Sequence, residues 1–272
     1  MLKVAVVGLG IIGGSLAGAL KKSGNYTVGG MNRSDYPIEY SLEHGFLDER
    51  AESLIGYDVV FIALPPEQTL RFLDVQTFQD GGIVADICGI KEPIEQLVYS
   101  KKRNYRYVGT HPMAGKEVSG IQNASPNLFS GANMVLTSCK DTDAEAYDCI
   151  KKMSVDMGFG RIVECSSSFH DKKIALTSQL AHILSNAYVK SDEIDSCFGF
   201  TGGSFQDMTR IAAVDENVWT DLYSFNSKNL LHQLNDLIFH LSQYGDALER
   251  GDKETLRNLL KEGRIIKETM KK

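Results

Sequence analysis

The sequence contains no apolar run that reaches the roughly 18 to 20 residues needed to cross a bilayer. Its first residues also lack the charged, apolar and small-residue zones of a signal peptide. We therefore expect a cytoplasmic protein that does not enter a membrane. Cysteine is scarce, because the five cysteines are scattered and none forms a C-x-x-C pair. That distribution argues against a disulfide framework and against a metal site.

Basic residues are in the minority. The 29 lysines and arginines are outnumbered by 35 aspartates and glutamates, which gives a formal net charge of -6. A general nucleic-acid binder needs a positive surface to displace counterions from phosphates, so the charge balance argues against that class. With 43% hydrophobic and 24% charged residues over 272 positions, the chain has the composition of a globular protein with one large domain or two moderate ones.

Short β-branched runs alternate with amphipathic stretches in the first half of the chain. The candidate strands are residues 2–7, 26–31, 58–63, 82–86 and 106–109, and the runs 133–137 and 161–164 would extend the sheet. This rhythm predicts an α/β fold with a Rossmann-type, doubly wound, mostly parallel sheet. We expect it to form a dinucleotide-binding domain over residues 1–165.

From Phe169 onward the pattern changes to helical periodicity with almost no strand signal. The predicted helices include residues 170–189, 217–248 and 253–271. An all-helical domain over residues 166–272 should therefore follow the sheet. Its segments carry more apolar residues than one small domain obviously buries, so we expect a homodimer formed through the helical domain.

A G-x-G-x-x-G motif follows the first candidate strand and opens a predicted helix, a context that strengthens an otherwise weak signal. The first glycine allows a tight turn, the second lets the backbone approach a pyrophosphate, and the third lets helix and strand pack closely. A glycine-rich turn without a ligand is the alternative. The residues expected to contact a dinucleotide are Gly8, Leu9, Gly10, Ile11, Ile12, Gly13 and Leu64.

The end of the second strand bears on the choice of cofactor. Where a carboxylate would accept a hydrogen bond from the ribose 2′-hydroxyl of NAD, the chain has Asn32, Arg33 and Ser34. Asn32 can bond a ribose without repelling a phosphate, and Arg33 with Ser34 could bind a 2′-phosphate by charge and hydrogen bonds. NADP is therefore the preferred cofactor in our reading. The alternative is that Arg33 is a solvated loop cation and that Asp35 serves NAD.

His111 lies in a segment that follows a candidate strand, at the carboxyl edge where open α/β sheets bind ligands. Pro112 fixes the backbone beside it, and the small residues around it allow close approach of a substrate and a nicotinamide. Taken alone, this residue could also be a structural loop histidine.

Together, the glycine fingerprint and the run His-Pro-Met-Ala-Gly-Lys-Glu at residues 111–117 resemble the prephenate dehydrogenase family, which includes arogenate and cyclohexadienyl dehydrogenases. Two further segments agree with this resemblance. One is His170-Asp171 followed by Ser-Gln-Leu-Ala-His at residues 178–182, and the other is the run 202–212 continued by Trp219 and Asn226. The matches occur in order over nearly the whole chain.

The resemblance implies oxidative decarboxylation of prephenate to 4-hydroxyphenylpyruvate, with hydride transfer to NAD(P), in tyrosine biosynthesis. Arogenate is the alternative substrate. His111 would accept the proton, or a strong hydrogen bond, from the ring hydroxyl, since a neutral imidazole is a competent base near pH 7. Arg210 would bind a substrate carboxylate through its guanidinium fork, with an ordinary helix-surface ion pair to Asp207 as the alternative.

Four other residues receive roles near the substrate. The resemblance carries over His182 as a substrate-binding group and His170 as a hydrogen-bonding group at the domain junction beside it. Glu117 would organise the loop or gate access by pairing with a cation, or would be a solvated carboxylate. Lys116 would help to attract an anionic substrate.

One departure from the family pattern concerns the histidine itself. Many members have Gly-Ser-Val-Lys after the fourth strand, with a serine that helps to hold the catalytic histidine, whereas this chain has Cys88-Gly89-Ile90-Lys91. Gly89 offers no hydroxyl, so another group, water or backbone must orient His111. Lys91 would lie near the substrate entrance or be solvated at a helix start.

Two other functions remain open at this point. A β-hydroxyacid or 6-phosphogluconate-type dehydrogenase shares the architecture but relies on a lysine in the substrate-domain helix. Here Lys172 and Lys173 occur near the start of that helix, yet the Ser-Gln-Leu-Ala-His pattern dominates it. In a non-catalytic dinucleotide-sensing protein, His111 and Arg210 would be incidental.

Overall fold

The computed structural model describes residues 1–115 and 118–270. These residues form two compact units, which divide between Asn226 and Ser227. The expectations placed on Lys116 and Glu117 therefore lie outside the described residues. Within the described ranges, every helix is too short or too polar to cross a membrane.

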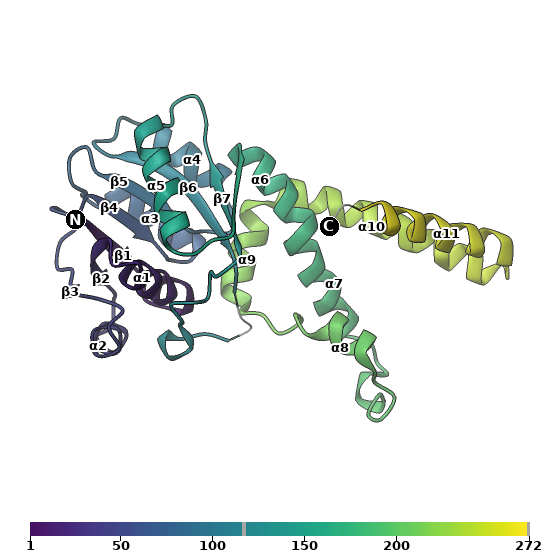
Figure 1. Cartoon of the computed structure of the whole chain (residues 1–272). Coiled ribbons are helices and arrows are strands. Elements are labelled where there is room, and N and C mark those ends of the chain that lie inside the picture. The colour runs from purple at the N-terminus through teal and green to yellow at the C-terminus, as the bar shows by residue number, and fades with distance from the viewer. Residues whose placement is uncertain (116–117, 271–272) are drawn as a thin grey trace. The chain divides into compact units, whose positions relative to one another are not determined.

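The first unit contains an eight-stranded sheet with the order β3-β2-β1-β4-β5-β6-β7-β8 (Figure 1). Neighbouring strands run parallel, except that β6 and β7 are antiparallel. The predicted α/β fold with a doubly wound, mostly parallel sheet is therefore confirmed. The strands are β1 (Leu2–Val7), β2 (Tyr26–Met31), β3 (Glu49–Arg50), β4 (Val59–Ile62), β5 (Ile83–Asp86), β6 (Arg106–Met113), β7 (Asn133–Thr137) and β8 (Arg161–Cys165).

Helices cover both faces of the sheet. Successive side chains of a strand point to opposite faces, so the apolar residues of each central strand pack into two separate cores. In β1, Val4 and Val6 enter a core that includes residues of α1, α2 and α5, whereas Ala5 and Val7 enter a core that includes residues of α3 and α4. These two cores hold the sheet and fix the positions of its strand ends. The helices are α1 (Ile11–Ser23), α2 (Tyr36–Glu43), α3 (Pro66–Val75), α4 (Glu92–Tyr99) and α5 (Ala144–Asp156).

The strand β6 is longer than the sequence predicts. The expected strand ended at residue 109, where pairing with the parallel neighbour β5 also ends, at Asp86 opposite Gly109. Antiparallel pairing with β7 then carries β6 on to Met113 and places His111 opposite Val135. The expectation that His111 follows the strand is wrong, since a second neighbour keeps its backbone in the sheet.

Helices follow β8, as predicted. In the first unit they are α6 (Ser167–Ile174), α7 (Leu180–Tyr188), α8 (Gly203–Thr209) and α9 (Glu216–Phe225), with a π-helical turn, Ala175–Gln179, between α6 and α7. The second unit consists of α10 (Ser227–Glu249) and α11 (Lys253–Thr269), which pack against each other.

The single helix predicted over residues 217–248 is wrong, because the helical hydrogen bonding is interrupted at Asn226. This residue has φ -113° and ψ 21°, and its buried side-chain amide donates to the backbone oxygen of Asp171 and to Oε1 of Gln179, both at 2.8 Å. These tertiary hydrogen bonds hold the chain in a turn where the apolar periodicity alone would continue the helix.

Candidate active site

The glycine loop between β1 and α1 has the geometry that its motif predicts. Gly8 has φ +90°, and a Cβ added to it would lie 2.4 Å from the backbone oxygen of Ala63. A Cβ on Gly13 would lie 1.9 Å from the backbone oxygen of Gly8, so both positions need glycine. Gly10, by contrast, has open space where a Cβ would be. The middle glycine thus leaves room for a ligand to approach the backbone.

Two cavities meet around this loop. One, of about 450 Å³, is lined by Gly10, Ile11, Ile12 and Gly13 and also by His111. The other, of about 410 Å³, is lined by Gly8 and by the residues after β2. Leu64 lines both cavities. An elongated ligand can therefore run across the loop, with one end near β2 and the other near His111.

A dinucleotide fits this arrangement. The amino end of α1 points its free N–H groups at the loop, and its first turn contains no acidic residue that would repel a phosphate. Asn32 accepts a hydrogen bond from the backbone N–H of Leu9 at 3.0 Å, which ties the end of β2 to the loop. The fit rests on the open Gly10 and the two flanking cavities.

The cavity beyond β2 is lined by Asn32, Arg33 and Ser34. The Asn32 amide donates to the backbone oxygen and to the hydroxyl of Ser34, both at 3.1 Å. Asp35 is engaged by Arg50, with 2.7 Å between guanidinium nitrogen and carboxylate oxygen. The carboxylate that could have served NAD therefore already has a cationic partner.

His111 lines the cavity of about 450 Å³ beside the glycine loop, and its Nδ1 lies 2.8 Å from Nε2 of His170. The Nδ1 of His170 in turn lies 2.7 Å from Oδ1 of Asp171. The surrounding protein partly buries the His111 ring, and this burial, followed by the interactions of the ring with His170 and Lys91, holds its pKa well below the ordinary value of 6.5. The ring is consequently a neutral imidazole near pH 7.

His170 is 2% exposed, and both of its ring nitrogens are hydrogen-bonded within the protein. That engagement favours a role in holding His111 over direct contact with a substrate. Asp171 was missed as a site residue, because its position behind His170 depends on how α6 packs against α4. It accepts the first backbone N–H groups of α4, from Lys91 at 2.8 Å and Glu92 at 2.9 Å.

Lys91 contradicts the expectation of a solvated or substrate-facing lysine. Its side chain is fully buried, and its ammonium pairs with Oδ2 of Asp86 at the end of β5. Asp86 is also fully buried and accepts a hydrogen bond from the Tyr107 hydroxyl at 2.5 Å and from the backbone N–H of Cys88 at 2.9 Å. Lys91 is thus a structural cation behind the site.

His182 lines a separate cavity of about 360 Å³. Ser119 lines both this cavity and the one that contains His111, so the two adjoin. The Nδ1 of His182 donates to the backbone oxygen of Ser178 at 2.9 Å, and its ring packs on Trp219 with 3.9 Å between centroids. Arg210 is exposed and follows α8 directly, next to Ile211, which lines the same cavity.

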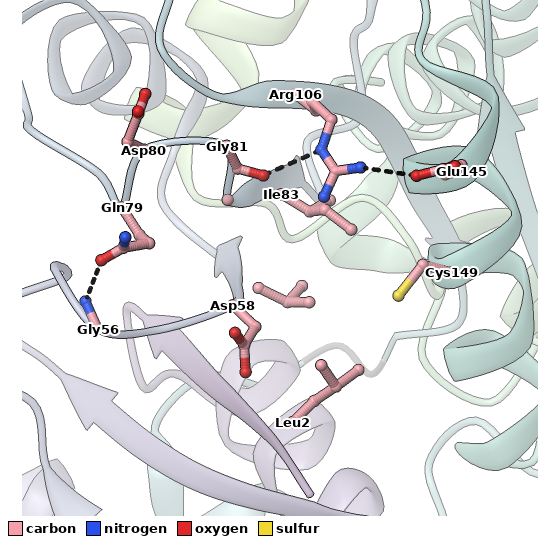
Figure 2. A pocket seen from close by; sticks show the side chains of 12 residues that line it. Leu2, Gly56, Asp58, Gln79, Asp80, Gly81, Ile83, Arg106, Glu145 and Cys149 are labelled. Carbon is pink, nitrogen blue, oxygen red and sulfur yellow. Dashed lines mark hydrogen bonds and ion pairs between the residues drawn. The ribbon is translucent and has the colours of Figure 1, made fainter.

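A larger cavity, of about 630 Å³, lies elsewhere, at the starts of β1, β4, β5 and β6 (Figure 2). There the guanidinium of Arg106 donates to the backbone oxygen of Gly81 at 3.0 Å and pairs with Glu145 at 3.6 Å. His111 is five residues further along β6, or roughly 16 Å at about 3.3 Å per residue. This cavity therefore belongs to the opposite edge of the sheet.

Among residues 1–115 and 118–270, no cluster of three or more histidine, cysteine or acidic side chains could hold a metal ion. What the described residues do bring together is a glycine loop, two cavities of about 450 and 410 Å³ beside it, and a neutral histidine that lines one of them. A Rossmann-type fold with this site defines a nicotinamide-dinucleotide-dependent dehydrogenase.

Comparison with known families agrees with this class and narrows it. The nucleotide-binding domain of prephenate dehydrogenase matches residues 16–163, and the dimerization domain of prephenate dehydrogenase matches residues 166–262. Together they cover most of the chain. The chain belongs to the prephenate dehydrogenase family, whose members are NAD-dependent dehydrogenases.

Individual relatives point the same way. A prephenate dehydrogenase of Bacillus subtilis is 30% identical, over 93% of this chain and 72% of the relative. The crystal structure of a prephenate dehydrogenase from Aquifex aeolicus in complex with hydroxyphenyl propionate and NAD+ has a TM-score of 0.83 at 27% identity, over 98% of this chain and 97% of that one. An arogenate dehydrogenase from Synechocystis has a TM-score of 0.78 at 26% identity, over 98% and 99%.

Proposed function

We propose that this protein oxidises and decarboxylates prephenate to 4-hydroxyphenylpyruvate on the route to tyrosine, with arogenate as the alternative substrate. The observation that carries the proposal is that His111, whose pKa is held well below 6.5, lines the same cavity as the glycine loop from Gly10 to Gly13. Membership of the prephenate dehydrogenase family supports it and favours it over a β-hydroxyacid type of dehydrogenase or a sensing protein.

In the proposed reaction, a bound nicotinamide supplies the hydride acceptor. His111 accepts the proton of the ring hydroxyl on its Nε2 as hydride leaves the carbon that carries this hydroxyl. The ring carboxylate then leaves as carbon dioxide, and the electron pair of the broken carbon–carbon bond makes the ring aromatic. The phenolate oxygen finally takes the proton back from His111, so no net proton is consumed.

We also propose that the preferred cofactor is NADP. Arg33 and Ser34 line the cavity beyond β2, where a 2′-phosphate would lie. Asp35, which would repel that phosphate, is instead paired with Arg50. An NAD+ complex of a relative supports use of the dinucleotide in general. The proposed contact with the 2′-phosphate would be made by Arg33 and Ser34.

For the substrate, we propose that Arg210 binds a carboxylate and that His182 contacts the side chain of the cyclohexadienol. Since His182 donates from Nδ1 to Ser178, its Nε2 is the ring nitrogen left for a ligand. A neutral Nε2 accepts from the ammonium of arogenate, whereas a protonated one donates to the carboxylate of prephenate. Lys116 and Glu117 keep the roles proposed from the sequence, in attracting the anion and ordering the loop.

The helical part is proposed to form a homodimer, with the boundary between the domains after residue 165. The family description of residues 166–262 as a dimerization domain supports this. So does the number of large apolar side chains that the second unit leaves exposed, namely Leu231, Ile238, Phe239, Leu241, Leu248, Leu260, Ile265, Ile266 and Met270. Light scattering of the purified protein would return twice the 30.0 kDa chain mass if this holds.

The experiment that tests the function follows reduced cofactor by absorbance, with prephenate or arogenate as substrate and NAD or NADP as acceptor. We expect turnover with prephenate and NADP, and a loss of kcat of roughly 100-fold or more in His111→Ala with dinucleotide affinity retained. If folded, dinucleotide-binding protein turns over neither substrate, the proposal fails. Full activity of His111→Ala would remove this residue from the mechanism.

A further inference from the structure

The hydrogen-bond partners of His111 determine which of its nitrogens carries the proton. Asp171 accepts two backbone N–H groups, from Lys91 and Glu92, so its carboxylate acts as an acceptor. The ring nitrogen of His170 that faces Asp171 must therefore be the protonated one. The opposite nitrogen of a neutral His170 is then an acceptor, and it faces Nδ1 of His111.

Because Nε2 of His170 is an acceptor, only one tautomer of the neutral His111 ring can form this hydrogen bond. His111 donates from Nδ1 to His170, and its Nε2 carries the lone pair. The reverse tautomer would set the lone pair of His170 Nδ1 against the Asp171 carboxylate at 2.7 Å, which is repulsive. Since Nδ1 is engaged, the basic nitrogen is the one available to the cavity.

Gly89 occupies the other side of the ring. A Cβ added there would lie 3.8 Å from Nε2 of His111, so a serine at this place would have its hydroxyl close to the basic nitrogen. In this chain, Gly89 has no side chain on the Nε2 side of the ring. The groups that orient His111 must therefore lie on its Nδ1 side. The described contacts on that side run through His170 to Asp171.

We infer that Asp171, acting through His170, is the positioning residue that keeps the proton of His111 on Nδ1 and the lone pair on Nε2, in place of a serine at Gly89. The inference rests on the proposed base role of His111. When Nε2 gains the substrate proton, the Nδ1 proton stays in its bond to His170, and the nearby carboxylate offsets the new positive charge. No proton needs to pass along the chain.

A cycle of variants separates this role from simple structural support. In Asp171→Asn the amide can donate to His170 and reverse its tautomer, so kcat should fall roughly 100-fold. In His170→Gln the side-chain oxygen can accept from His111 while the amide nitrogen donates to Asp171, so the order of donors and acceptors can be kept. We therefore expect His170→Gln to retain more kcat than Asp171→Asn, and Asp171→Asn to cost little more in a His170→Leu background, where the link between Asp171 and His111 is absent.

If Asp171→Asn lowers kcat by the same factor in both backgrounds, Asp171 only caps α4 and the inference is overturned. Should the Asp171 variants fail to fold, His170→Asn replaces them, because its short amide can still donate to Asp171 but cannot reach His111. It should lose roughly 10- to 100-fold in kcat relative to His170→Gln. Equal activity of the two would overturn the inference as well.

A spectroscopic measurement tests the tautomer of His111 independently of the proposed enzyme activity. Nitrogen NMR of the imidazole groups reports the protonated nitrogen of His111 without any substrate. We expect the proton on Nδ1 in the native protein and a shift of population to Nε2 in Asp171→Asn. A native His111 with the proton on Nε2 overturns the inference. Lack of turnover with both cyclohexadienols, together with the expected NMR result, would refute only the proposed function.

Discussion

The ammonium of Lys91 lies against the carboxylate of Asp86 in a place where neither side chain reaches solvent. A buried ion pair of this kind gains little over an apolar pair, but removing one partner leaves the other charge without compensation. The pair also borders the turn that carries Cys88 and Gly89, which lines the cavity in front of His111. Its loss should therefore affect both folding and the site.

Lys91→Met is expected to lower the free energy of unfolding by about 3–5 kcal/mol, because it leaves the Asp86 carboxylate buried and unpaired. Lys101→Met is the matched control, since it breaks an ion pair with Asp74 in which both side chains are about half exposed. Urea unfolding of the two variants measures the difference. A loss in Lys91→Met as small as in the control would show that water reaches Asp86.

The activity should tolerate mild acid. His111 must be neutral to accept a proton, and its pKa is held well below 6.5 by burial and by its interactions with His170 and Lys91. Burial also lowers the pKa of His170, and the carboxylates of Asp171 and Asp86 offset that shift only in part. As the pH falls through 6.5, kcat should therefore stay level and decline only at lower pH. A kcat profile with a midpoint near 6.5 would contradict the burial of the base.

Cofactor choice can be tested at Arg33. Replacing it with alanine removes a charge-assisted hydrogen bond to a 2′-phosphate, which is worth roughly 1.5–3 kcal/mol, or about 10- to 100-fold in affinity. Arg33→Ala should raise the KM for NADP by that factor and leave the KM for NAD nearly unchanged. Arg71→Ala, on the exposed face of α3, is the control for a general loss of positive charge. Equal weakening of both cofactors by Arg33→Ala would rule out the contact.

Arg210 has a comparable test with the substrate. Arg210→Ala should raise the KM for prephenate roughly 10-fold or more with a smaller change in kcat, since a bond to a substrate carboxylate is made before and during the reaction. Arg210→Lys keeps the charge but loses the planar fork, so it should fall between alanine and the native protein. If the KM of Arg210→Ala is unchanged, the carboxylate is bound by another group.

The sequence predicted local patterns well and long-range contacts poorly. Apolar runs and the glycine spacing identified β1 and the loop from Gly8 to Gly13, because both depend on neighbouring residues. The extension of β6 to Met113 depends on pairing with β7, and the burial of Lys91 depends on Asp86. A lysine at a helix start is solvated in most proteins, so its own sequence context gave no signal of burial.

The same limit applies within the site. His170 and His182 were both placed near the substrate by resemblance, yet one contacts His111 and the other lines an adjoining cavity with Trp219. A π-helical turn lies between the two helices that carry them, and it changes the relation of their faces by an amount that residue spacing does not reveal. The histidines were identifiable from sequence, whereas their different contacts required the structure.

The missing serine supplies the last test. Gly89→Ser would place a hydroxyl near Nε2 of His111, at the cost of a shift of Leu222, whose Cδ2 would lie 3.3 Å from the new Cβ. In the Asp171→Asn background, where the His111 tautomer is no longer fixed, the serine hydroxyl should favour the basic Nε2 by donating to it. We expect Gly89→Ser to recover kcat roughly 3- to 10-fold there, as one ordinary hydrogen bond of about 1 kcal/mol would. Gly89→Ala makes the same contact with Leu222 without a hydroxyl, so it should recover nothing, and equal recovery by both variants would mean that packing rather than hydrogen bonding orients the base.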